Sequence, residues 1–175
     1  ADAVETKKAV FAIADHQGPV YLRLSRAAAP VYYSEDMKFE IGKGITVRDG
    51  RDVTIITTGT VLHKALAAAE LLEAKGIRAR VVDMHTIKPI DEELIIECAR
   101  ETGAIVTVEE HSIYGGLGSA VAEVLAERCP VPMERVGAVD FAESGDYGQL
   151  MEKYGYGPES IALRCRAVMG RRQDN

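Results

Sequence analysis

The sequence predicts an α/β fold in three layers, αβα, around a mostly parallel sheet of about five strands with one antiparallel edge strand. From residue 44 onward, short apolar runs rich in β-branched residues alternate with segments of helical periodicity. This alternation is typical of parallel strands joined by right-handed crossovers. At 175 residues, the chain is long enough for one compact domain with some extra chain attached.

Composition and charge narrow the function classes. A formal charge of −6 gives no basic face for nucleic acid. The cysteines, at 98, 129 and 165, are odd in number and widely spaced, so they form neither a zinc motif nor a disulfide framework and fit a reducing cytoplasm. No apolar run approaches the ~20 residues of a membrane span, and no signal peptide opens the chain. The chain starts without methionine, which is consistent with a piece of a longer protein.

The first 39 residues are not expected to form a domain of their own. We expect a helix from Val4 to Gln17, with Val10, Ile13 and Ala14 on its inner face, ended by Gly18-Pro19. Residues 20–25 have the pattern of a strand, and 27–39 lose all periodicity, as a linker does. One helix and one strand cannot close a core, so residues 1–26 are expected to be the tail end of another domain.

Regular elements follow the linker. A short strand over 44–48 is expected to turn at Asp49-Gly50, as a hairpin, into a strand over 53–57. Thr58-Gly59-Thr60 opens a helix that Gly76 ends. Residues 80–83 form the next strand, and a proline turn leads to Asp91, a helix cap. The later elements are a helix bearing Leu94, Ile95, Cys98 and Ala99, strands over 104–108 and 133–139, a helix from Leu117, and two short helices, the last starting at Gly157-Pro158.

The stretch 104–128 is the centre of this pattern. A buried strand ends in Glu109-Glu110-His111, and a glycine-rich turn leads into a helix. Open α/β sheets bind ligands at the carboxyl ends of their strands. The turn is not a dinucleotide fingerprint, because Val121 stands where the third glycine belongs. Two interpretations stay open: a structural turn, or an anion or partner contact made by His111, Gly115, Gly116, Gly118 and Ser119.

Other chemistry is absent from the residue pattern. We find no Ser-His-Asp set, no paired-carboxylate site and no metal-ligand cluster. Arg23 and Arg26 are three apart, so in an extended strand they point to opposite faces and one of them can face a phosphate.

Five blocks of the sequence together resemble a known enzyme family. They are Gly18 to Arg26, Val53 to Gly59, Val81 to Asp91, Glu109 to Gly118, and the closing Tyr154-Gly155-Tyr156-Gly157 with Ile161. In this order they closely resemble the C-terminal part of transketolase, and the match covers nearly the whole chain.

The resemblance implies a domain assignment. Transketolases are thiamine-diphosphate enzymes with a diphosphate-binding, a pyrimidine-binding and a C-terminal domain. Residues 1–26 then correspond to the end of the pyrimidine-binding domain, 27–39 to a linker and 40–175 to the C-terminal domain. The glutamate that activates the cofactor and the Gly-Asp-Gly motif that holds magnesium and diphosphate lie outside this chain, which therefore has no catalytic residues. Arg26 matches the arginine that binds the phosphate of the sugar phosphate.

The implied function is transfer of a two-carbon ketol unit between sugar phosphates, in the cytoplasmic pentose phosphate pathway. The complete enzyme uses thiamine diphosphate and magnesium, and we expect this chain alone to bind neither. It is expected to support a homodimer and to pair with an upstream half or a separate subunit. Alternatives are deoxyxylulose-phosphate synthase, which would prefer a tyrosine-proline pair at Leu24-Ser25, and the β-subunit of a 2-oxoacid dehydrogenase, which lacks the arginines. A free-standing phosphate- or partner-binding module is a third alternative.

Overall fold

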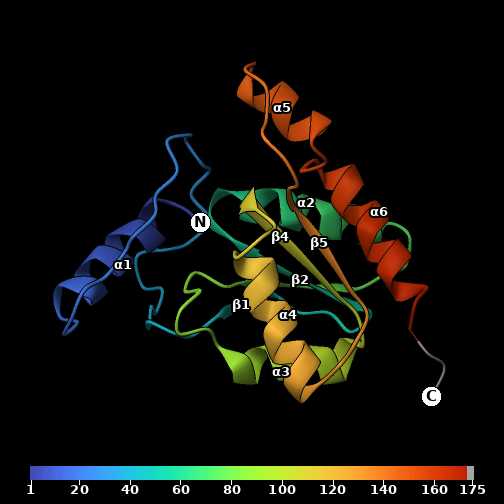
Figure 1. Cartoon of the computed structure of the whole chain (residues 1–175), viewed down its shortest axis with the longest axis horizontal. Helices are drawn as coiled ribbons and strands as arrows, with labels where there is room; N and C mark the ends of the chain where they lie inside the picture. Colours follow the sequence, from blue (N-terminus) through green and yellow to red (C-terminus); the bar gives the residue numbers. More distant parts are fainter. Residues whose placement is uncertain (173–175) are drawn as a thin grey trace.

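The computed structural model describes residues 1–172 and places a five-stranded sheet between two helical layers (Figure 1). The strand order is β1-β3-β2-β4-β5. The strands are β1 (Ile45–Arg48), β2 (Val53–Thr58), β3 (Ala79–Asp83), β4 (Ile105–Ser112) and β5 (Met133–Ala138). The helices are α1 (Ala3–Ala14), α2 (Leu62–Glu73) after the 3-10 turn η1 (Gly59–Val61), α3 (Glu92–Thr102), α4 (Leu117–Arg128), α5 (Tyr147–Lys153) and α6 (Pro158–Met169).

The fold class is confirmed. β2, β3, β4 and β5 pair in parallel, and β1 is an antiparallel edge strand. Consecutive residues of β2 point to opposite faces, so that Ile55 packs in the layer with α2 and α6, whereas Ile56 packs in the layer with α3 and α4. Both side chains are fully buried, as expected of a parallel sheet covered on both faces.

The expected hairpin at Asp49-Gly50 is wrong. β1 pairs with β3 and not with the strand that follows it, because both edges of β2 are already occupied by β3 and β4. The connection instead crosses the start of β3. A Cβ on Gly50 would lie 2.3 Å from the carbonyl carbon of Ala79, so only glycine fits at this crossing.

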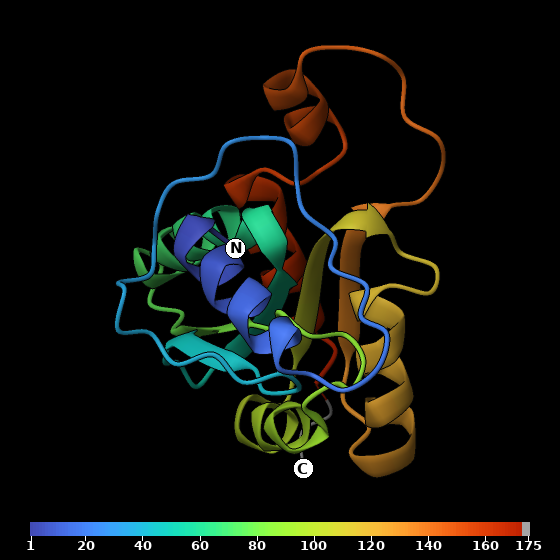
Figure 2. The same cartoon turned by 90° about the vertical axis from the view of Figure 1, so that its left-hand side faces the viewer.

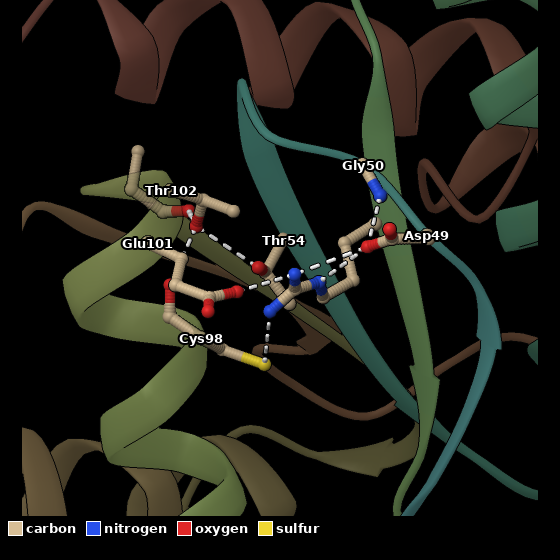
Figure 3. A network of polar contacts seen from close by, with 8 residues as sticks. Asp49, Gly50, Thr54, Cys98, Glu101 and Thr102 are labelled. Carbon is tan, nitrogen blue, oxygen red and sulfur yellow. Dashed lines mark hydrogen bonds and ion pairs between the residues drawn. The ribbon is translucent and has the colours of Figure 1, made fainter.

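A polar network around the buried Arg80 side chain holds this amino end of the sheet (Figure 3). The Arg80 guanidinium contacts Asp49 Oδ1 at 3.0 Å, Glu101 Oε2 at 2.5 Å and Cys98 Sγ at 3.8 Å. Next to it, the hydroxyls of Thr54 and Thr102 lie 2.9 Å apart. The network joins β2, β3 and the connection after β1 to α3, at the end of the sheet opposite to the carboxyl ends of the parallel strands.

Two expectations for the N-terminal segment are wrong. In α1 the buried residues are Val4, Glu5 and Ala9, whereas Val10 is 46% exposed, Ile13 is half-buried and Ala14 is exposed. Residues 20–25 form no strand, because no strand edge of the described chain lies beside them to pair with. Figure 2 shows this segment as part of a long loop that runs around α1 before the chain enters β1.

Asp2 and Tyr33 fasten that loop to the sheet. Asp2 caps α1 through the N–H of Glu5, and its other oxygen accepts the N–H groups of Tyr32 and Tyr33 at 2.6 and 2.7 Å. The Tyr33 hydroxyl donates to Asp83 Oδ2, at the carboxyl end of β3, at 2.8 Å. The linker is therefore held at the edge of the sheet where the candidate site lies.

Candidate functional site

The topological switch point of the sheet lies between β2 and β4. The chain passes from β2 to β3 on one side and then crosses to β4 on the other side of β2. In open α/β sheets, the crevice at the carboxyl ends of two such strands is the usual ligand position. Here these ends carry Thr58 to Thr60 from β2 and η1, and Glu109, Glu110 and His111 from β4.

Glu109 occupies the N-terminus of α4. Its carboxylate is 2% exposed and accepts the N–H groups of Leu117 at 2.7 Å and of Gly118 at 2.8 Å. Free N–H groups and the helix dipole favour an anion at this position. The protein supplies that anion itself, so the N–H groups of Leu117 and Gly118 are already bound and are not available to an external anion.

The glycines of the turn make room for this carboxylate. A Cβ on Gly116 would lie 2.0 Å from Glu109 Oε2, and one on Gly118 would lie 2.8 Å from the Arg135 side chain. Gly115 has φ +74°, which favours glycine. Sequence reasoning named the three glycines as a contact site but did not identify Glu109, which lies against Gly116 and accepts the N–H of Gly118.

The rest of the turn is closed by its own hydrogen bonds. The N–H of Gly115 donates to Ser119 Oγ at 2.9 Å, and that hydroxyl donates to the Ile113 carbonyl at 3.1 Å. Arg135 Nη1 donates to the same carbonyl at 2.9 Å. His111 and Tyr114 stay exposed beside the turn. The five residues named from the sequence therefore lie together: the N–H groups of Gly115 and Gly118 are bound within the protein, and the His111 side chain faces solvent.

Glu110 joins three segments that are far apart in sequence. Its Oε2 accepts hydrogen bonds from Thr60 Oγ1 at 3.0 Å and from the Tyr147 hydroxyl at 3.1 Å. Burial and then the charge of Glu110 raise the pKa of Tyr147, and burial with both neighbouring glutamates raises the pKa of the Tyr156 hydroxyl to about 12. Both phenols are therefore protonated at neutral pH. Sequence reasoning missed Thr60, Tyr147 and Tyr156, because no local pattern links them to Glu110.

A second cluster of polar side chains lies at the carboxyl end of β3. Asp83 is fully buried, and this burial raises the pKa of its carboxyl group. Burial also raises the pKa of its partner Tyr33. The His85 ring stacks on Phe39 of the linker with centroids 4.1 Å apart, and burial lowers the pKa of that imidazole. These contacts fix the linker against the sheet, and no spacing signal in the sequence could have revealed them.

The two arginines before the linker differ in their surroundings. Arg23 Nη2 donates to the carbonyl of Glu110 at 3.1 Å, so this arginine is bound next to the site. Arg26 is exposed, and within residues 1–172 its guanidinium forms no hydrogen bond or ion pair. No contact joins Arg26 to the glycine-rich turn in the same range.

Neither a metal cluster nor a membrane span is found in the described part of the chain. Residues 1–172 contain no group of three or more His, Cys, Asp or Glu side chains arranged to hold a metal ion. None of the helices in that range is long and apolar enough to cross a bilayer.

Comparison with known proteins gives consistent matches. The family model described as "Transketolase, C-terminal domain" matches residues 42–161. The chain is 45% identical over 172 residues to a 6-deoxy-6-sulfo-D-fructose transketolase subunit from Clostridium sp. (strain MSTE9), covering 98% of this chain and 53% of that protein. It is 46% identical over 170 residues to an apulose-4-phosphate transketolase subunit from Phocaeicola vulgatus, covering 96% of this chain and 53% of that protein.

A solved structure extends the match to three dimensions. The protein titled "Split gene transketolase, inactive beta4 tetramer" superposes with a TM-score of 0.96 at 47% identity. The match covers 99% of this chain and 57% of that one. The chain thus spans about half the length of the relatives it matches, 53% in both sequence comparisons.

Proposed function

Since the chain belongs to the transketolase C-terminal domain family, we propose that it is the C-terminal part of an enzyme that transfers a two-carbon ketol unit between sugar phosphates. One observation carries the proposal: 45% identity over nearly the whole chain to a transketolase subunit, of which the chain covers 53%. The remaining half of such a protein then supplies the reactive site.

The residues of this chain do not fit the family's cofactor. Thiamine diphosphate supplies a thiazolium ylid that stabilises carbanions, and its diphosphate is held through a metal ion and N–H donors. The N-terminus of α4 already holds the Glu109 carboxylate, which would repel a diphosphate. No metal-ligand group occurs among residues 1–172. We therefore propose that thiamine diphosphate and magnesium bind to the upstream part.

The proposed domain boundaries are 1–26 for the end of the pyrimidine-binding domain, 27–39 for the linker and 40–175 for the C-terminal domain. Exposed apolar side chains support the first boundary. Phe11 is 66% exposed and Tyr21 is 87% exposed, and the backbone of residues 20–25 is paired with no strand of the described chain. An upstream sheet would pair with that backbone and cover those side chains.

Arg26 is proposed to bind the phosphate of the sugar phosphate. Its guanidinium is exposed and unpaired within residues 1–172, and its planar fork suits a phosphate group. The Arg26 guanidinium would then reach the reactive site from the end of the pyrimidine-binding domain.

The glycine-rich turn is proposed to be a partner contact rather than an anion site. The N–H groups of Gly115, Leu117 and Gly118 are occupied, but His111 and the 68%-exposed Tyr114 face outward. The partner we propose is the cofactor-binding half, within a homodimer of the complete enzyme. The three free cysteines fit the reducing cytoplasm, where the pentose phosphate pathway operates.

An assay of the chain with and without the upstream half of the enzyme tests this proposed function. The chain alone should show no ketol transfer and no thiamine diphosphate binding by calorimetry, whereas addition of the upstream half should restore transfer. In that mixture, Arg26→Ala should raise the KM of the sugar phosphate roughly 10-fold or more, while Arg23→Ala, its control, should leave it nearly unchanged. Turnover or micromolar cofactor binding by this chain alone would refute the proposal. Formation of deoxyxylulose phosphate by the mixture would favour the synthase instead.

A further inference from the structure

An apolar arm projects from the sheet beyond β5. We name residues 139–157, which comprise a loop and α5, the arm; Figure 1 shows it standing away from the sheet at the top of the molecule. Phe141 is 98% exposed and Val139 is 67% exposed. These two side chains, separated by one residue, form an apolar pair at the start of the arm, directly after β5, and such exposed apolar side chains are typical of an interaction site.

The arm is braced internally. Glu143 pairs with Lys153 and accepts a hydrogen bond from the Tyr154 hydroxyl at 3.3 Å. At its base, Met151 and Tyr156 are buried in the core layer that contains α2 and α6. The loop that carries Val139 and Phe141 is therefore fixed at both ends, by β5 on one side and by this braced segment on the other.

A groove with complementary chemistry lies between α2 and α6. It has a volume of about 300 Å³, and its exposed apolar walls are Leu71 and Leu163. Lys75 and Arg166 line the same groove with Glu159, and neither cation forms an ion pair within residues 1–172. The groove is therefore apolar in the middle and carries a net positive charge.

We propose that this groove binds the arm of a second copy of the chain, with Phe141 between Leu71 and Leu163. Asp140, next to Phe141, has no ion pair within residues 1–172, and its carboxylate then lies near Lys75 and Arg166. The apolar pair Val139 and Phe141 matches the apolar walls, and the Asp140 carboxylate matches the net positive charge that Lys75 and Arg166 give the groove beside Glu159.

A second copy is the fitting occupant because each chain carries both halves of the contact. The contact is head-to-tail, so it gives a pair with two reciprocal contacts, a ring, or an open chain of copies, according to the rotation between neighbouring copies. This inference does not rest on the proposed function, since it concerns only association of the chain with itself.

Sedimentation velocity at increasing concentrations tests the contact. Phe141→Ser and Leu163→Glu should each raise the dissociation constant of self-association roughly 10-fold or more. Both side chains are exposed, so circular dichroism should show unchanged folding. The control Val31→Ser alters another exposed apolar residue outside the contact and should leave association unchanged.

A mixture of the two variants gives the sharpest result. Phe141→Ser copies keep an intact groove and Leu163→Glu copies keep an intact arm, so the mixture should form pairs joined by one contact. A wild-type chain that is monomeric at every concentration would overturn the proposal. So would association that both variants leave unchanged, association that only Phe11→Ser abolishes, or a mixture that forms no pairs.

Discussion

Replacing Glu109 by glutamine tests whether an internal carboxylate holds the glycine-rich turn. The side chain is 2% exposed and accepts two backbone N–H groups at the start of α4. A hydrogen bond to a charged group contributes about 1.5–3 kcal/mol, and a charge at a helix terminus about 0.3–2 kcal/mol. In Glu109→Gln the amide has only one accepting oxygen, and its NH₂ group faces a backbone donor.

The expected loss of unfolding free energy is therefore about 2–4 kcal/mol. Urea unfolding followed by circular dichroism measures it. Glu123→Gln is the matched control: it makes the same change on the exposed face of the same helix and should shift stability by less than about 0.5 kcal/mol. If Glu109→Gln matched that control, Glu109 would not be holding the helix terminus, and the turn would be open to an external anion again.

Three further predictions concern other parts of the fold. Arg80→Met should lower the free energy of unfolding in urea by about 1–3 kcal/mol, because it removes the centre of the polar network. The control Arg78→Met changes an exposed arginine and should alter this free energy little; equal losses in the two variants would contradict the role of the network. Iodoacetamide at pH 8 should label Cys129 first, since burial raises the pKa of the Cys98 and Cys165 thiols. Peptide mapping that finds Cys98 or Cys165 labelled before Cys129 would refute this prediction. Because the pKa of Asp83 is raised in the folded state, its ionisation costs stability as the pH rises above the unfolded pKa of ~3.9. The free energy of unfolding of Asp83→Asn, measured in urea, should thus rise relative to that of the wild type as the pH increases from 4 to 7. A difference between the two proteins that stays constant over this range would contradict the prediction.

The contacts of this chain support the proposal that it has a structural role and that the upstream part of the enzyme carries the reactive site. The carboxyl ends of β4 and β3 are closed by Glu109, by Glu110 with its two hydroxyl donors, and by Asp83 with Tyr33. These contacts fasten the linker, the turn and the arm to the sheet. We infer that the domain supports and positions neighbouring surfaces, while the reaction takes place elsewhere in the complete enzyme.

Sequence periodicity predicted most elements because their signals are local. The cap at Asp91 and the proline at the start of α6 are each decided by neighbouring residues, and both predictions are confirmed. The failures concern pairing. The edge strand β1 had a correct location but the wrong neighbour, since a two-residue turn cannot reveal that β2 is already paired on both sides. Residues 20–25 have a strand composition, but a strand also needs an edge to bind.

By itself, the sequence determined the α/β class, the order of the elements, the family resemblance and the presence of a glycine-rich turn after β4. Only the tertiary structure decided what that turn surrounds and which groups meet at the switch point. Glu110, Thr60 and Tyr147 come from three separate segments, and their hydrogen bonds form only when the parallel strands bring the carboxyl ends together. Elements arise from short-range periodicity and capping, whereas sites arise from contacts across the sheet, which no local pattern records.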